Sequence, residues 1–341
     1  MVIMPFFKKD KNILLFILAL TLLIGYFYIK NSRDYDYSKN FDYEETKNSL
    51  LKEVEKYGPE KTYKKFKKKI EKNNPIEQHL ITHIFGEVLF DKEGVGGLIY
   101  CDNSFQSACF HGLFGKAVYS SGDSVISEMD KYCLKEEDHT LSANCQHGLG
   151  HGLLQYTGYD NLEDALFLCD NLTNQKDPLF GCTGGVFMEY NFPSLNISSD
   201  SSSFNGFTIK HRDFDLQNPY KPCDTLPYKF KKACYHGLVS IWYPPYRTYH
   251  KINDLCHNLP ESEFVTACFE GFGRNIPLIN SFDLIWSREI CLTDTNEEEA
   301  LACLSGARSA FESMDEYKDL GVEICNDLHP LMKEKCLLYL W

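Results

Sequence analysis

Two pairs of histidines in this sequence are spaced four residues apart, at His79 and His83 and again at His147 and His151. On a helix, side chains four residues apart lie on the same face, so each pair could present two imidazoles to one ligand. Imidazole is a common ligand of zinc and other divalent transition metals, and it can act as a general acid or base near neutral pH. Neither pair has the HExxH form of a zinc hydrolase, so the pattern predicts a metal or proton-transfer site without naming a reaction.

Histidine also recurs at one position of a repeated motif. The position lies two residues after a cysteine and directly before a glycine, as in ACFHGLFG and NCQHGLGHG. Along the chain it is occupied by His111, His147, Gly184, His236, Glu270 and Ser305, with His83 at the matching place of a leading unit that has no cysteines. A polar position repeated along an array could line one surface with metal ligands or with acid and base groups. Alternatively, these side chains only satisfy backbone groups in the first turn of their helices, and the sequence leaves both interpretations open.

A shared metal ion sets a geometric condition on these histidines. Packed helices lie about 8 to 10 Å apart, whereas a metal–nitrogen bond is about 2 Å long. Equivalent histidines can therefore meet only if the array curves strongly, and the pair His147 and His151 would need a third ligand from a neighbouring unit. The candidate ligands for zinc or another divalent transition metal are His111, His147, His151 and His236. Further pocket candidates are His79, His83, Glu87, Glu189, Glu270, Arg274 and Arg308. Of these, Glu189 and Glu270 are expected to face solvent and could add a carboxylate ligand.

The fourteen cysteines form an even set that is large for a cytosolic chain, which indicates an oxidising compartment. They fall into pairs whose first members are roughly 32 to 36 residues apart, except for one longer interval. Equivalent units must pair alike, so each cysteine should bond to the other cysteine of its own unit. Closing a loop of about a dozen residues stabilises the fold by roughly 3 kcal/mol. The predicted disulfides are Cys101–Cys109, Cys133–Cys145, Cys169–Cys182, Cys223–Cys234, Cys256–Cys268, Cys291–Cys303 and Cys325–Cys336.

The segments between the cysteine pairs predict helices. Stretches such as NLEDALFLC and FDLIWSREIC are apolar at three- and four-residue spacing, which indicates one helix ending near the first cysteine of a unit and another starting at the second. Residues 75–90 match the second helix of a further unit. A period near 34 residues with two helices predicts an all-α fold, an α-solenoid of helical hairpins that could close toward a toroid. The longer interval holds an insertion, about residues 193–217, whose SSDSSS run predicts a loop.

An unbroken apolar run near the N-terminus, residues 13–29, predicts a transmembrane helix. The run ends in aromatic rather than small residues, so an uncleaved signal-anchor is favoured over a signal peptide. Lysines before the run favour a cytoplasmic N-terminus. The predicted segments are a cytoplasmic N-terminus at 1–12, the anchor at 13–29, a tether at 30–58 and an extracytoplasmic helical-repeat domain at 59–341, at the cell surface, in the periplasm or in a lumen.

The period and the hairpin layout resemble tetratricopeptide and Sel1-like repeats over most of residues 60–341, although the motif residues differ. The resemblance implies a concave surface that binds partners. A net charge of -13 argues against nucleic acid as a partner. The sequence therefore predicts a membrane-anchored scaffold that binds a protein, peptide or glycan on its concave face. The alternative is a metal-binding protein or metal-dependent enzyme that uses the histidines, and the sequence leaves open whether the chain is an enzyme.

Overall fold

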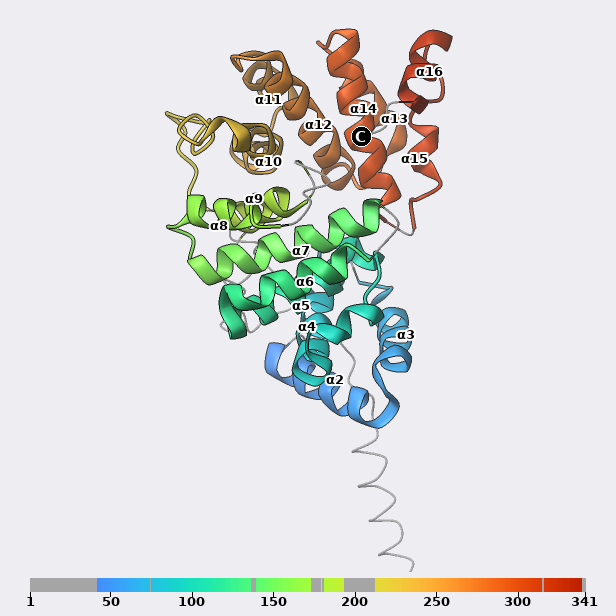
Figure 1. The fold of residues 1–341 in the computed structure, drawn as a ribbon. Coiled ribbons are helices and arrows are strands. Elements are labelled where there is room, and N and C mark those ends of the chain that lie inside the picture. Colours follow the sequence, from blue (N-terminus) through green and yellow to red (C-terminus); the bar gives the residue numbers. More distant parts are fainter. Residues whose placement is uncertain are drawn as a thin grey trace, which may run out of the picture.

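The structure is built from helices and turns throughout the part of the chain that it describes (Figure 1). This computed structural model describes residues 42–73, 75–135, 139–172, 179, 181–192, 212–314 and 316–338. The predicted transmembrane anchor and residues 193–211 of the predicted insertion lie outside these ranges. Within them, no helix combines the length and the apolar character needed to cross a membrane.

A row of helices forms the spine of the array (Figure 1). The row consists of α4 (Pro75–Glu93), α5 (Ser104–Ser121), α7 (His139–Thr157), α9 (Cys182–Asn191), α10 (Tyr228–Tyr246), α12 (Ser262–Ile279) and α14 (Glu297–Glu312). Each of these helices packs against the next one, and α4 takes its place on α5 although it carries no cysteine. The row also curves, because the side chain of Gln106 at the start of α5 lies 3.4 Å from the sulfur of Met314 after α14.

Shorter elements pack against this row; most of them connect its members, and the last two follow its final helix. They are η1 (Gly94–Tyr100), η2 (Gly122–Val125), α6 (Ile126–Cys133), α8 (Leu162–Cys169), α11 (Tyr249–His257), α13 (Leu284–Leu292), α15 (Leu320–Glu323) and α16 (Pro330–Leu338). Two further helices, α2 (Tyr43–Tyr57) and α3 (Pro59–Ile70), precede the row. The arrangement confirms an all-α fold of repeated helix pairs.

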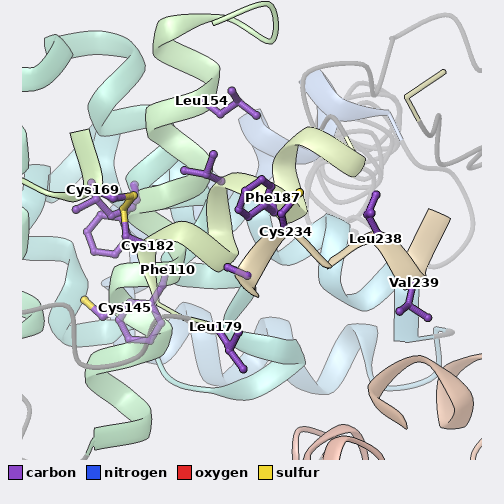
Figure 2. Close-up of a cluster of buried hydrophobic side chains, with 14 of the residues drawn as sticks. Phe110, Cys145, Leu154, Cys169, Leu179, Cys182, Phe187, Cys234, Leu238 and Val239 are labelled. Atoms are coloured by element: carbon purple, nitrogen blue, oxygen red, sulfur yellow. A yellow bond between two sulfur atoms is a disulfide. The ribbon is translucent and has the colours of Figure 1, made fainter. Parts of the chain in front are cut away.

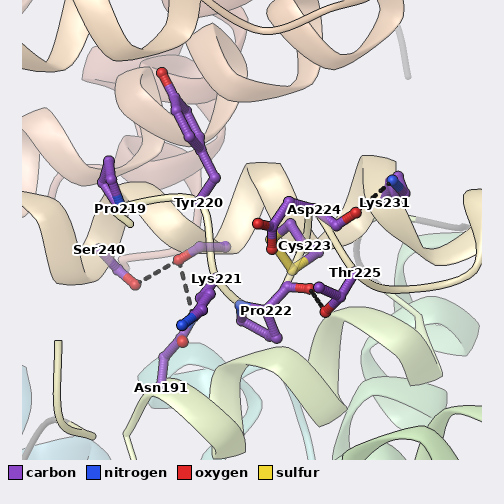
Figure 3. Close-up of a disulfide and its surroundings, with 12 residues drawn as sticks. Asn191, Pro219, Tyr220, Lys221, Pro222, Cys223, Asp224, Thr225, Lys231 and Ser240 are labelled. Carbon is purple, nitrogen blue, oxygen red and sulfur yellow. Dashed lines mark hydrogen bonds between the residues drawn. A yellow bond between two sulfur atoms is a disulfide. The ribbon is translucent and has the colours of Figure 1, made fainter. Parts of the chain in front are cut away.

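All seven predicted disulfides are present, each within one unit. Helices α6 and α8 end at Cys133 and Cys169, as predicted. Cys223 instead lies within a series of turns, in which Thr225 Oγ1 donates a hydrogen bond of 2.9 Å to the carbonyl oxygen of Pro222 (Figure 3). The pairing therefore follows the repeat even where turns replace the first helix of a unit.

The second helices begin earlier than predicted. Helix α9 begins at its cysteine, Cys182, and the regular helix of α5 begins after residues 105–107, whose φ angles are positive, while the others described begin more than a full turn before their cysteines. In α14 the start is set by a capping box, in which the Asn296 side chain accepts from Glu299 N–H and the Glu299 carboxylate accepts from Asn296 N–H. For α14 the prediction was wrong because this capping residue, rather than the cysteine, determines where the helix starts.

Helix α2 lies within the segment predicted as a tether. Its residue Lys47 forms an ion pair of 3.0 Å with Glu87 on α4, and the hydroxyl group of Tyr43 donates to the same carboxylate. The folded domain therefore starts earlier than the predicted boundary at residue 59.

Apolar side chains from neighbouring row helices fill the space beside the disulfides (Figure 2). Phe110 from α5, Phe187 from α9 and Val239 from α10 are all buried there. The Cys169–Cys182 disulfide lies in the same cluster, so each covalent link is part of the packed interior.

Candidate metal centre

Glycines that follow the repeated positions bring several successive row helices into close contact. A Cβ atom on Gly112 of α5 would lie 1.8 Å from the carbonyl oxygen of His83 on α4. A Cβ atom on Gly185 of α9 would likewise lie 1.9 Å from the carbonyl oxygen of His147 on α7. Only glycine allows backbones to approach this closely, and the contact occurs beside the histidines themselves.

Five histidines from three adjacent helices meet as a result. His79 and His83 extend from α4, His111 from α5, and His147 and His151 from α7. The ring of His111 is central: its centroid lies 4.5 Å from that of His151, 5.2 Å from those of His147 and His79, and 5.3 Å from that of His83. Equivalent histidines in successive units therefore do converge.

The five side chains form two groups of three that could each hold a metal ion. One group is His79, His83 and His111, and the other is His111, His147 and His151. Within each group, one nitrogen from every ring lies within 4.8 Å of the others. Since a metal–nitrogen bond is about 2.0 to 2.1 Å long, small side-chain movements would place three nitrogens around one ion.

A carboxylate on α9 orients His151 toward the centre of the cluster. His151 Nδ1 donates to Glu189 Oε2 over 2.8 Å, and Tyr159 holds the other carboxylate oxygen with a hydrogen bond of 2.5 Å. His151 Nε2 then carries a lone pair, and this buried atom has no hydrogen-bond partner among the described residues. A carboxylate behind a ligating imidazole is a common feature of metal sites because it fixes the ring and raises its basicity.

A backbone carbonyl orients His79 in the same way. His79 Nδ1 donates to the carbonyl oxygen of Phe105 over 2.8 Å, which leaves Nε2 as the acceptor atom. The Nε2 atoms of His79 and His83 are 3.1 Å apart, so His83 Nε2–H donates a hydrogen bond to His79 Nε2. Two nitrogens bound to one tetrahedral ion would be about 3.3 Å apart, which is close to this spacing.

Burial keeps His79, His83 and His111 neutral at neutral pH, because it lowers the pKa of each ring. Burial lowers the pKa of His79 to about 4, although its hydrogen bond to Phe105 acts in the opposite direction. Burial, reinforced by neighbouring histidines, also lowers the pKa of His83 and of His111 well below the usual value. Neutral imidazole is the form that binds metals, so no proton has to be removed from these rings before an ion can bind.

Two of the rings are enclosed and two are accessible. His111 is 4% exposed and His151 is 3% exposed, whereas His83 and His147 are partly exposed. His111 Nδ1, like His151 Nε2, is buried without a hydrogen-bond partner in the described part of the chain. A buried polar atom without a partner costs about 1 to 3 kcal/mol, a cost that a bound ion would remove.

His236, the fourth predicted ligand, lies apart from the two groups. Its Nε2 atom is 3.9 Å from Glu270 Oε1, and burial together with the charges of Arg274 and Lys232 lowers its pKa to about 3. His236 is therefore neutral, and this contact is not an ion pair. The cause of the separation is visible in the repeat, because Gly184 occupies the histidine position on α9, between α7 and α10.

The two glutamates expected to face solvent are buried instead. Glu189 is fully enclosed by its contacts with His151 and Tyr159, and Glu270 is 6% exposed. The expectation was wrong because both side chains point into the packed row, where histidines from neighbouring helices contact them. Glu189 is thus a hydrogen-bond partner of a candidate ligand.

The other predicted pocket residues contact groups outside the cluster. Glu87 accepts from Tyr43 and Lys47 on α2. Arg274 donates to Ser309 over 3.2 Å, and Arg308 pairs with Glu312 at 2.7 Å within α14. None of these contacts brings a further charged ligand to the five histidines.

Sequence reasoning did not find the single cluster that joins both histidine pairs. The available signal was the glycine after each repeated position, because it indicates close contact between helices at that point. Phe105, Tyr159 and Met188, whose sulfur lies 3.4 Å from His147 Nε2, carry no signal in the sequence that links them to a histidine site.

Comparison of the chain with protein-family models, with curated proteins and with solved structures finds no match. The resemblance to tetratricopeptide and Sel1-like repeats therefore stays a prediction. By fold and by site, the chain is an all-helical repeat protein with one disulfide in each cysteine-containing unit and a five-histidine cluster within its helix row.

Proposed function

We propose that this protein binds a divalent transition metal through the histidine cluster of α4, α5 and α7. One observation carries the proposal: buried nitrogens of His111 and His151 lack hydrogen-bond partners among the described residues while other imidazoles surround them. Apolar surroundings disfavour such atoms unless they bind something. Water could satisfy one of them, but several neutral imidazoles with converging nitrogens are better suited to a metal ion.

The donor set favours zinc, copper, nickel or cobalt over magnesium or calcium. All five donors are imidazole nitrogens, whereas magnesium and calcium select oxygen ligands. Thiolate ligands are excluded, because all fourteen cysteines are paired in disulfides. The ligands of the site are therefore imidazoles, which bind divalent transition metals of intermediate softness.

The proposed location is the outer side of a membrane, to which residues 13–29 would tether the domain. Seven disulfides support an oxidising compartment. The apolar run supports the tether by its length and composition. In such a place the protein could bind or buffer metal outside the cytoplasm. The scaffold function, with a protein, peptide or glycan on a concave face, and a metal-dependent activity stay predictions.

Metal analysis of the purified full-length protein in detergent tests this proposal. After chelation, incubation with zinc and desalting, the wild-type protein should retain zinc in a fixed ratio. The variant His111→Ala should lose it, because both groups of three depend on this ring. His250→Ala is the matched control, since His250 lies exposed on α11 beside Asp294, and it should retain zinc like the wild type. A wild-type protein that retains no zinc, copper, nickel or cobalt contradicts the proposal.

A further inference from the structure

We infer that the cluster holds two metal ions, one in each group of three, with the ring of His111 bridging them. The inference rests on the proposed metal-binding function and specifies its stoichiometry. It follows from how the five rings share neighbours, from the chemistry of the shared residue and from the contacts that hold the two ends of the cluster.

The rings form two triangles that meet at one vertex. The centroids of His79 and His83 lie 4.7 Å apart, and those of His147 and His151 lie 5.1 Å apart. His111 completes both triangles. Between the two pairs, the ring centroids of His83 and His151 lie 6.3 Å apart. A single ion bound by all five rings would need every donor within about 2.1 Å of one point, which two separate triangles do not provide.

Histidine is suited to such a shared vertex because its ring has two nitrogens, separated by one carbon, whose lone pairs point in different directions. An ion on each nitrogen of His111 would give both ions three protein ligands. The ions would then be on the order of 6 Å apart, from two metal–nitrogen bonds of about 2 Å each and the width of the ring. His111 Nδ1 supports this arrangement, because it is buried and has no hydrogen-bond partner in the described residues.

Proton balance follows from the bridge. A neutral imidazole carries one N–H bond, and a ring bound to two ions carries none. Binding of the second ion therefore breaks this bond and forms a metal–nitrogen bond, and the proton passes to the buffer without electron transfer. Release of protons on metal binding is the general consequence of using deprotonated ligands.

Each end of the cluster also holds one ring in the orientation that metal binding requires. On the α4 side, the Phe105 carbonyl accepts from His79 Nδ1, and on the α7 side, Glu189 accepts from His151 Nδ1. In both groups the outer hydrogen bond leaves Nε2 as the donor atom toward the ion. Metal-ligating histidines almost always have such a partner on the other ring nitrogen, and each group of three contains one.

The first test is the stoichiometry of zinc bound to the chelator-treated full-length protein. The wild type should bind two zinc ions per chain. His79→Ala and His147→Ala should each reduce the ratio to one, because each removes a ligand from one group alone. His250→Ala should leave the ratio at two. A wild-type ratio of one would overturn the two-ion inference and leave the proposed metal-binding function standing, whereas a ratio of zero would contradict both.

The second test uses the wild-type protein alone, so it does not depend on how any variant folds. Electron paramagnetic resonance should show a mononuclear copper(II) signal after one equivalent of copper(II). The second equivalent should decrease that signal, because an imidazolate bridge couples the two spins. Two additive, uncoupled signals, or a second equivalent that remains unbound, would overturn the bridge. His79→Ala loaded with copper(II) provides the reference for an isolated ion.

Discussion

The two halves of the helix row have the same architecture but different polar side chains. In the first half, the repeated position carries His83, His111 and His147, and in the second half it carries His236, Glu270 and Ser305. Close backbone contacts occur in both halves, although not at Gly237. A Cβ atom on Gly271 would lie 2.1 Å from the His236 carbonyl oxygen, and one on Gly306 would lie 2.0 Å from that of Glu270.

The comparison separates what the scaffold provides from what the side chains provide. Glycine contacts and disulfides place one residue per unit at equivalent points of the row, whatever that residue is. Only the first half fills three successive points with imidazoles and adds His79 and His151 one turn away. The cluster therefore depends on residue identity at positions that the repeat has already brought together.

The largest effect should come from breaking the close contact in the first half. Gly112→Ala would place a methyl group 1.8 Å from the His83 carbonyl oxygen, so α4 and α5 must move apart. We expect a loss of about 3 kcal/mol or more in the free energy of unfolding, together with loss of bound zinc. Gly237→Ala is the control in the second half, because its Cβ atom would meet only side-chain atoms at ordinary contact distances, Asn191 Nδ2 at 3.4 Å and Phe187 Cβ at 3.5 Å. Denaturant unfolding with the disulfides intact measures both, and equal effects would contradict the packing argument.

A smaller effect on the free energy of unfolding should distinguish the two halves at acidic pH. His236 has a folded pKa of about 3, close to Glu270, Arg274 and Lys232, against an unfolded value of about 6.5. Between these values the unfolded chain binds the proton and the folded chain does not, so stability falls as the pH decreases from 6.5 toward 3. For this one group the loss between pH 7 and pH 5 is at most about 2 kcal/mol.

The variant His236→Asn should show a weaker decrease of the metal-free protein's unfolding free energy between pH 7 and pH 5. It should also keep wild-type zinc binding, because His236 lies outside both groups of three. Chemical denaturation at the two pH values provides the comparison. An unchanged pH dependence would show that His236 is not held neutral in the folded protein.

The smallest effect concerns the two buried glutamates. Glu189→Gln keeps the shape of the side chain but removes the charge that accepts from His151 Nδ1. We expect zinc affinity to fall about tenfold, or about 1.4 kcal/mol, since the partner of a ligating imidazole orients the ring. Glu270→Gln should leave zinc affinity unchanged. Competition with a chelator measures both, and a similar loss in the two variants would remove the distinction between the halves.

Repetition in the sequence was sufficient to predict several features. Seven local disulfides and the cysteine-free helix of residues 75–90 follow from the spacing of equivalent residues, and the structure confirms them. Helix starts were predicted less well, because capping residues such as Asn296 act locally and differ between units. A shared metal site was predicted to require a curved array, and the contact between Gln106 and Met314 shows that the row curves.

The composition of the site was harder to predict because it depends on distances between helices. His111, His147 and His151 were candidate ligands, and the structure brings them together. His236 was also a candidate, but α9, with Gly184 at the equivalent position, separates it from them. The burial of Glu189 follows from its contact with His151, which the spacing of residues along one helix does not reveal.

X-ray absorption at the zinc edge of the zinc-loaded full-length protein identifies the atoms that bind the ion. We expect a first shell dominated by nitrogen at about 2.0 to 2.1 Å, with the outer scattering typical of imidazole rings and no sulfur at about 2.3 Å. The His111→Ala variant should lose this spectrum while His250→Ala keeps it. A first shell of oxygen or sulfur, or an imidazole spectrum that persists in His111→Ala, would contradict a metal site built on the histidines of α4, α5 and α7.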